Sequence, residues 1–291
     1  MPSPPLSVPT PLVDIHWLHT HRHDPTLTVI DCRFALGDPQ AGRQAYQTGH
    51  IPGAFYLDLH QDLASPVQRH GGRHPLPAID ALAAKLTALG ITSQPATPVV
   101  AYDASQGAFA SRLWWLLRYL GHGAIAVLDG GWPAWQAAGY PVEQAVPSPP
   151  QNGNFSPQVQ ADWVVDRAEV EQRREDSATV LVDARSPERY RGEQEPIDPI
   201  AGAIPGAVNF FWQDNLDEQG QFLSPAALRS RWQALALGPQ PIFYCGSGVT
   251  ACVNLLAQAV LGNPLPQLYV GGWSDWCSYP LAPAPAADGD R

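Results

Sequence analysis

Residues 241–261 read PIFYCGSGVTACVNLLAQAVL, and the predicted fold class follows from this stretch. Pro241–Tyr244 is a short apolar and aromatic run, which predicts a buried strand. From Val249 onward apolar residues recur at helical spacing, which predicts an amphipathic helix. A tight turn with two glycines, Cys245–Gly248, joins them. This order is typical of a parallel α/β sheet, where ligand sites lie at the carboxyl ends of strands.

The glycine turn also predicts an anion-binding site around Cys245. Successive backbone N–H groups and a helix N-terminus, which carries about half a positive charge, attract anions. Such surroundings favour the thiolate, which is the nucleophilic form of cysteine. The same N–H groups could hold an anionic sulfur attached to Cys245. This stretch alone leaves open the alternative of a buried structural cysteine.

The composition predicts a globular protein with two domains. The chain has 291 residues, of which 45% are hydrophobic and 15% charged, and a domain usually takes about 150 residues. The formal net charge of −10 argues against a nucleic-acid or anionic-membrane partner. A small anionic substrate is still compatible with this charge, because a diffuse field is screened beyond about 8–10 Å.

The N-terminal sequence MPSPPLSVPTPLVDIHW predicts neither a signal peptide nor a transit peptide. No stretch approaches the roughly 20 apolar residues that cross a bilayer. Four cysteines without paired spacing indicate a reducing compartment, so we expect a cytoplasmic protein. Cys32 and Cys252 are expected to be buried thiols. Because the chain has no Cys-x-x-Cys pair or Cys/His cluster, we expect no metal site and no cofactor.

Four sequence blocks recur in the same order in both halves of the chain. They are TVIDCR at 28–33 and VLVDAR at 180–185, IPGA at 51–54 and 204–207, VVAYD at 99–103 and PIFYC at 241–245, and GGW at 130–132 and 271–273. Self-similarity in a fixed order is the signature of a repeat. The sequence therefore predicts a duplicated domain.

Short apolar strands alternate with helical patterns in each half. Strands are expected near 27–31, 98–103, 125–128, 180–183, 242–244 and 268–270, and helices near 79–89, 108–120, 163–174, 225–235 and 249–261. This alternation predicts an α/β fold in which each domain is a mainly parallel sheet with helices on both faces. Residues 141–157 are rich in Pro, Gly and Asn and mark the boundary. We predict a first domain of 1–145, a linker of 146–160 and a second domain of 161–291.

The duplication compares Cys245 directly with its counterpart. The first half carries Asp103 at the matching position. A carboxylate cannot attack sulfur, and it is poorly suited to a ring of N–H groups that holds an anionic substrate. We therefore expect the second domain to be catalytic and the first to be an inactive domain that shapes the cleft.

The repeat, the paired IPGA and GGW blocks and the loop CGSGVT at 245–250 resemble the tandem-domain rhodanese family of sulfurtransferases. The resemblance implies two rhodanese-like domains and a two-step transfer. Cys245 would take a sulfane sulfur from a small anionic donor, thiosulfate or 3-mercaptopyruvate, and become a persulfide. It would then pass the sulfur to cyanide, a thiol or a thioredoxin-like acceptor. The donor-binding loop residues would be Gly246, Ser247, Gly248, Val249 and Thr250.

The resemblance gives conflicting indications about the donor. The loop resembles the mercaptopyruvate branch, whereas the thiosulfate branch usually has basic residues there. Arg189 matches a family arginine that binds the donor's anionic end, which suits the fork of a guanidinium; the alternative is a surface arginine. Mercaptopyruvate enzymes usually carry a second arginine several residues later, but the run EPIDPI at 195–200 has no base. The donor therefore stays open.

Ser247 matches a family serine proposed to work with a His and an Asp of the first domain. His74 is the candidate histidine. The position of the Asp is occupied by His60, which leaves Asp58 or Asp62 nearby. The alternative is a loop serine that satisfies only its own backbone.

Two other classes of function share features with this sequence. A Cys-x5-Arg phosphatase also places a thiolate among N–H groups, but it needs an arginine at position 251, which is Ala251. That excludes the phosphatase. A non-catalytic rhodanese-like binding or regulatory module is the remaining alternative, although the chain keeps both Cys245 and its loop.

Overall fold

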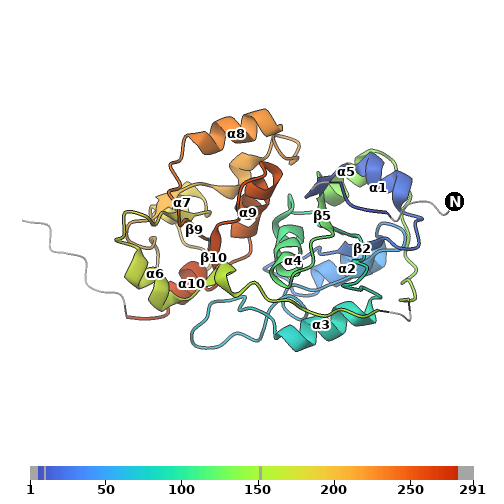
Figure 1. The fold of residues 1–291 in the computed structure, drawn as a ribbon, viewed down its shortest axis with the longest axis horizontal. Coiled ribbons are helices and arrows are strands. Elements are labelled where there is room, and N and C mark those ends of the chain that lie inside the picture. Colours follow the sequence, from blue (N-terminus) through green and yellow to red (C-terminus); the bar gives the residue numbers. More distant parts are fainter. Residues whose placement is uncertain (1–5, 10, 151–152, 281–291) are drawn as a thin grey trace, which may run out of the picture.

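The computed structural model describes residues 6–9, 11–150 and 153–280. Residues 1–5 and 10 of the predicted first domain, 151–152 of the predicted linker and 281–291 of the predicted second domain lie outside the described residues. The chain forms two α/β units side by side (Figure 1). No helix in the described ranges is long and apolar enough to cross a membrane.

Each unit is built on one five-stranded sheet, and the two sheets share one topology. The strand orders are β1-β5-β4-β2-β3 and β6-β10-β9-β7-β8, and every recorded strand pair is parallel. The two orders superimpose strand for strand, so the predicted duplication and the predicted parallel α/β fold are confirmed.

The elements of the first unit are β1 (Leu12–Val13), α1 (Ile15–His21), β2 (Thr28–Asp31), α2 (Ala41–Thr48), β3 (Phe55–Tyr56), α3 (Ile79–Ala88), β4 (Val99–Tyr102), α4 (Ala108–Tyr119), β5 (Ile125–Leu128) and α5 (Gly131–Ala137). Those of the second unit are the 3-10 helix η1 (Ala161–Trp163), β6 (Val164–Val165), α6 (Arg167–Arg173), β7 (Leu181–Asp183), α7 (Pro187–Tyr190), β8 (Val208–Asn209), the 3-10 helix η2 (Trp212–Asn215), α8 (Pro225–Gln233), β9 (Ile242–Tyr244), α9 (Ala251–Val260), β10 (Gln267–Tyr269) and α10 (Gly272–Trp276).

Helices cover both faces of the first sheet because successive strand residues point to opposite sides. Ile30 and Val99 belong to a core with α3 and α4, whereas Val29 and Val100 belong to a second core with α1 and α5. All residues of β2, β4 and β5 are buried, as is typical of parallel strands covered on both faces.

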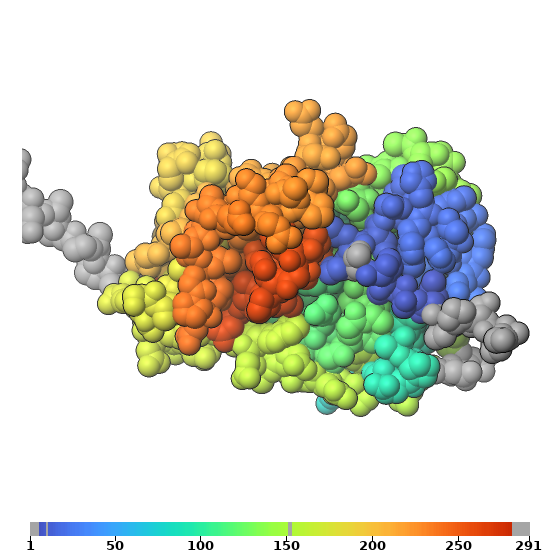
Figure 2. All heavy atoms as spheres, turned by 45° about the horizontal axis from the view of Figure 1, so that its top comes forward, coloured from blue at the N-terminus to red at the C-terminus, as the bar shows by residue number. Residues whose placement is uncertain are grey.

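The two units share one apolar core. Helix α4 of the first packs against α9 of the second, and a single cluster of buried side chains runs through both units. In the space-filling view, atoms of the second unit (yellow to red) meet those of the first (blue to green) along a continuous boundary (Figure 2). This packing brings the carboxyl ends of β4 and β9 toward each other.

The described part of residues 141–157 contains no helix and no named strand. It runs along the first unit and is fastened to it. The backbones of His50 and Glu143 exchange two hydrogen bonds, of 2.8 and 2.9 Å, and Ser93 N donates to Asn154 O at 3.1 Å. The domain limits at 145 and 161 stay a prediction.

One predicted helix, 163–174, is wrong in its first part. Val164 and Val165 form strand β6 and pair with Leu268 and Tyr269 of β10. Helix α6 begins only after Asp166, whose side chain accepts from Glu169 N while the Glu169 carboxylate accepts from Asp166 N. This reciprocal capping box fixes the helix start. Several short elements were not predicted, namely β1, β3, β8, α1, α2, α5, α7 and α10.

Candidate active site

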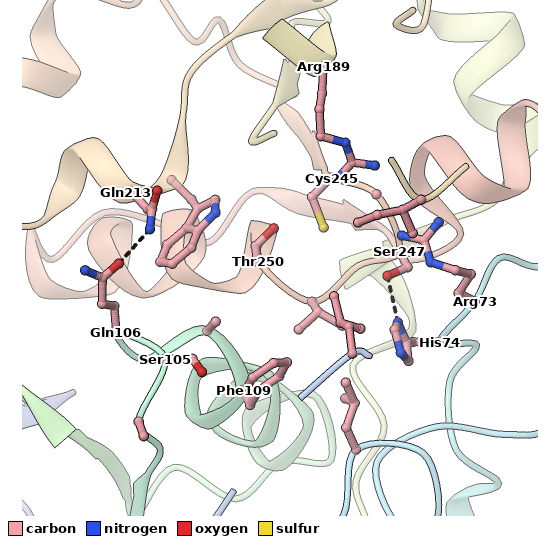
Figure 3. A pocket seen from close by; sticks show the side chains of 18 residues that line it. Arg73, His74, Ser105, Gln106, Phe109, Arg189, Gln213, Cys245, Ser247 and Thr250 are labelled. Carbon is pink, nitrogen blue, oxygen red and sulfur yellow. Dashed lines mark hydrogen bonds between the residues drawn. The ribbon is translucent and has the colours of Figure 1, made fainter. Parts of the chain in front are cut away.

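A cavity of about 430 Å³ opens between the two units at the carboxyl end of β9. Figure 3 shows the sulfur of Cys245 pointing into the space enclosed by the surrounding side chains. Of the predicted site residues, those that line the cavity are Cys245, Gly246, Ser247, Val249, Thr250, Arg189 and His74. Gln213 of the second unit donates to Gln106 of the first at 2.7 Å on the opposite wall.

The Cys245 turn is fixed by the second GGW block. Trp273 N donates to Cys245 O at 2.8 Å, and Ser274 N donates to Gly246 O at 2.9 Å. Gly272 has φ +59°, and a Cβ there would lie 2.4 Å from Cys245 O. Trp132 N makes the same bond to Asp103 O in the first unit, also at 2.8 Å. The GGW blocks therefore hold the turn that follows each central strand.

Gly248 is the one predicted loop residue that does not line the cavity. Its φ is +70°, and a Cβ would lie 2.5 Å from Val270 O, so only glycine fits this position. Its carbonyl accepts from Arg112 Nη1 at 3.0 Å and from Cys252 Sγ at 3.3 Å. Gly248 thus permits the conformation of the turn on the side that faces away from the cavity.

We call the backbone N–H groups of residues 246–251 the open cradle. Among the described residues, no protein atom accepts a hydrogen bond from these groups. In the first unit, four backbone N–H groups of the corresponding turn are used by the Asp103 carboxylate. It accepts from the backbone N–H of Ser105 at 2.7 Å, Gly107 at 2.9 Å, and Phe109 and Ala110 at 2.8 Å each. The first ring is therefore filled by its own anion, and it is closed to a substrate.

The other three cysteines lie outside the cavity lining and are buried thiols. Burial raises the pKa of Cys252 to about 12, and it raises the pKa of Cys32 as well. The expectation for these two residues is confirmed. Cys245, with 2% of its surface exposed, is the described cysteine that lines the cavity.

His74 reaches Ser247 across the boundary between the units. His74 Nδ1 lies 2.7 Å from Ser247 Oγ. Burial, followed by the charge of Arg112, lowers the pKa of His74 to about 3. The imidazole is therefore neutral near pH 7, so it can exchange a hydrogen bond with the serine hydroxyl without adding charge to the cavity.

Neither aspartate considered for a triad contacts His74. The Asp58 carboxylate accepts from the backbone N–H of His60 at 2.8 Å and of Gln61 at 3.0 Å, and Asp62 pairs with Lys85 at 2.9 Å. The far nitrogen of His74 instead lies 3.1 Å from His60 Nε2. The polar chain thus runs Ser247–His74–His60, with an imidazole where the family pattern has a carboxylate.

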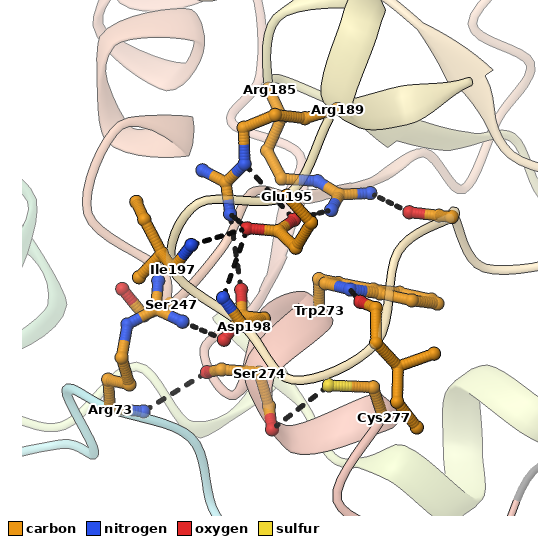
Figure 4. A network of polar contacts seen from close by, with 12 residues as sticks. Arg73, Arg185, Arg189, Glu195, Ile197, Asp198, Ser247, Trp273, Ser274 and Cys277 are labelled. Carbon is orange, nitrogen blue, oxygen red and sulfur yellow. Dashed lines mark hydrogen bonds and ion pairs between the residues drawn. The ribbon is translucent and has the colours of Figure 1, made fainter. Parts of the chain in front are cut away.

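Arg189 is held by carboxylates of the run that follows it. Its Nη2 pairs with Glu195 at 2.7 Å and with Asp198 at 3.1 Å, and Arg185 also pairs with Glu195, at 3.3 Å. Figure 4 shows this network of arginines and carboxylates. With 17% of its side chain exposed and a place in the cavity wall, Arg189 is no ordinary surface arginine.

A family model for the rhodanese-like domain matches residues 14–138 and again residues 166–279. The chain belongs to this rhodanese family. A probable 3-mercaptopyruvate sulfurtransferase of Pseudomonas aeruginosa is 46% identical over 270 residues, which cover 91% of this chain and 94% of the relative. A putative thiosulfate sulfurtransferase of Mycobacterium tuberculosis is 38% identical over 260 residues, which cover 88% and 90%.

A solved structure has the same two-unit architecture. The crystal structure of SseA from Escherichia coli, a 3-mercaptopyruvate sulfotransferase with the rhodanese fold, aligns with a TM-score of 0.79 at 31% identity. The alignment covers 91% of this chain and 99% of that one. The rhodanese fold predicted for both halves is therefore confirmed.

Sequence reasoning missed two arginines of this rhodanese site, both from the first unit. Arg112 on α4 is fully buried, and it donates to Gly248 O at 3.0 Å and to His74 O at 3.2 Å. No described carboxylate pairs with it. Arg73 lines the cavity beside His74. The available signal for Arg112 was a charged residue within the apolar helical pattern 108–120. For Arg73 it was a basic residue adjacent to the expected His74.

Proposed function

We propose that this chain is a sulfurtransferase that carries a sulfane sulfur as a persulfide on Cys245. The observation that supports this most strongly is the pair of equivalent turns. One ring of N–H groups binds the Asp103 carboxylate, whereas the N–H groups of the open cradle, which follow Cys245 in the chain, have no acceptor among the described residues. A thiolate or persulfide anion on Cys245 would find there the donors that Asp103 finds in the first unit.

In the first step the Cys245 thiolate attacks the transferable sulfur of the donor. With thiosulfate, the S–S bond breaks and sulfite leaves with the electron pair. With 3-mercaptopyruvate, the C–S bond breaks and the pyruvate enolate takes up the proton that the donor thiol gives up. In the second step cyanide, a thiol or a thioredoxin-like protein takes the outer sulfur, and Cys245 returns to the thiolate.

The other predicted residues have roles that differ between the donors. Arg189 binds the donor's anionic end through its guanidinium. Ser247 and the neutral His74 can pass a proton between the donor thiol and the enolate, because their polar atoms are 2.7 Å apart. Only 3-mercaptopyruvate requires such a proton transfer. Turnover of thiosulfate does not depend on it.

Catalysis belongs to the second domain, 161–291, and the first domain, 1–145, is an inactive partner that completes the cavity. The reaction needs Cys245 as a free thiol, which a reducing compartment such as the cytoplasm provides. No cofactor is required, since the steps above move only sulfur, electron pairs and protons.

The proposal is tested by weighing the intact protein after it has been mixed with donor and freed of excess reagent. We expect a mass gain of one sulfur atom, lost again on addition of cyanide, and no gain in Cys245→Ser. Cys252→Ser is the matched control, because its thiol is equally buried but lies outside the cavity. Turnover by Cys245→Ser, or sulfur found on another residue, would contradict the mechanism.

A further inference from the structure

We propose that Arg73 of the first unit is a second donor-binding arginine, which grips the donor's carboxylate together with Arg189 and selects a keto-carboxylate donor over thiosulfate. This inference rests on the proposed function. It assigns to Arg73 the place that the arginine-free run 195–200 leaves vacant.

The two guanidinium groups meet over the glycine next to the nucleophile. A Cβ placed on Gly246 would lie 2.8 Å from Arg73 Nη2, and 3.6 and 3.7 Å from Arg189 Nη2 and Nη1. Both side chains line the cavity. An anion held by this pair is therefore adjacent to Cys245.

Asp198 aligns the two arginines. One of its oxygens pairs with Arg73 Nη1 and the other accepts from Arg189 Nη2 at 3.1 Å (Figure 4). The Asp198 backbone N–H in turn donates to Glu195 at 3.0 Å, and Arg73 N donates to Ser274 Oγ at 3.1 Å. The run 195–200 lacks a base, but its two acids orient an arginine from each unit.

Each arginine keeps one terminal nitrogen for a ligand. Arg73 Nη2 and Arg189 Nη1 have no acceptor in the part of the chain that the structure describes, whereas their other terminal nitrogens bond to carboxylates. Two such N–H donors on neighbouring guanidinium groups match the two oxygens of a carboxylate. Because Asp198 bridges the pair, the distance between the two donors is set before the donor molecule arrives.

The charge balance favours a singly charged donor. The positive charges of Arg73 and Arg189 are matched by the negative charges of Glu195 and Asp198, and the loop 246–250 carries no base. The charge of the buried Arg112 is matched by the thiolate that the proposed mechanism places on Cys245. Bringing a dianion into this neutral, largely buried setting costs more desolvation than bringing a monoanion. 3-Mercaptopyruvate has one carboxylate and a thiol, whereas thiosulfate is a dianion.

The test compares Arg73→Lys and Arg73→Ala with wild type in steady-state assays with each donor. Arg69→Ala is the matched control, because Arg69 is an exposed arginine on the same loop. For 3-mercaptopyruvate we expect the KM of Arg73→Ala to rise about 10- to 100-fold, which corresponds to losing one hydrogen bond between charged groups. Arg73→Lys keeps the charge for Asp198 but loses the free Nη2, so we expect a raised KM with an unchanged Tm.

The rate at which the isolated persulfide transfers its sulfur to cyanide separates a binding defect from a structural one. A structural defect would change this rate, whereas the loss of a donor-binding group would not. We expect the discharge rate of both Arg73 variants to match wild type, since no donor is bound in that step. A KM for 3-mercaptopyruvate equal to that of Arg69→Ala overturns the inference, as does slowed discharge. An equal loss for thiosulfate and 3-mercaptopyruvate overturns the donor selectivity. Failure of wild type itself to form a Cys245 persulfide would instead refute the proposed function.

Discussion

Replacing Asp103 with asparagine removes the anion that fills the first unit's ring of N–H groups. Oδ1 accepts from the N–H of Ser105 and Gly107, and Oδ2 accepts from Phe109 and Ala110. Asparagine keeps one oxygen, but its NH₂ group then faces two N–H donors. Two hydrogen bonds to a charged group are lost, at about 1.5–3 kcal/mol each. Because burial raises the pKa of Asp103, loss of the charge recovers part of its desolvation cost, so the lower end of the range, about 3 kcal/mol, is expected.

Urea unfolding followed by circular dichroism measures this loss in the free energy of unfolding. The matched control is Asp38→Asn, because Asp38 is exposed and its carboxylate accepts one backbone hydrogen bond, from Gln40 at 3.0 Å. We expect that control to stay within about 0.5 kcal/mol of wild type. The kcat per folded molecule of Asp103→Asn should be close to wild type, since Asp103 does not line the cavity. Unchanged stability would refute the internal-anion interpretation, and a collapsed kcat would show that the Asp103 turn takes part in the chemistry.

Two further predictions concern the arginine and the histidine of the cavity. Arg189→Ala should raise the KM of the donor more than it slows persulfide discharge, as separate half-reactions would show; equal effects on both would return Arg189 to a structural role. His74→Gln should make the protein less sensitive to acid, because His74 binds a proton below about pH 6.5 when unfolded but only below about pH 3 when folded. Wild type therefore loses stability as the pH falls through this window, by about 2 kcal/mol from this group between pH 7 and pH 5. Urea titrations of both proteins at the two pH values measure the difference, and identical acid losses would contradict it.

The central strands could be predicted because their own residues determine them. Strands β5 (Ile125–Leu128) and β9 (Ile242–Tyr244) lie within the predicted limits, since short apolar runs bounded by polar or glycine residues have few other stable environments. Strands β1, β6 and β8 have two residues each. Two residues are too few to show the hydrophobic periodicity from which a strand is predicted. These strands form because a neighbouring strand supplies their hydrogen bonds.

The candidate site divides in the same way. The turn from Cys245 to Thr250 is local, so its place at a strand end could be predicted from the sequence. Which side chains of the first unit reach that turn depends on how α4 packs against α9, which local patterns do not encode. For this reason Arg73 and Arg112 were missed. The exchange of an aspartate for His60 was visible in the sequence, but its contact with His74 at 3.1 Å was not.

The buried guanidinium of Arg112 links the two repeats at the candidate active site. It donates to the carbonyl of Gly248 in one repeat and to that of His74 in the other. A displacement of one repeat relative to the other would therefore disturb both residues. Helix α4 of the repeat without a nucleophile is therefore tied to the turn that carries Cys245 in the other repeat. A substitution in the first repeat that displaces Arg112 will therefore change catalysis in the second.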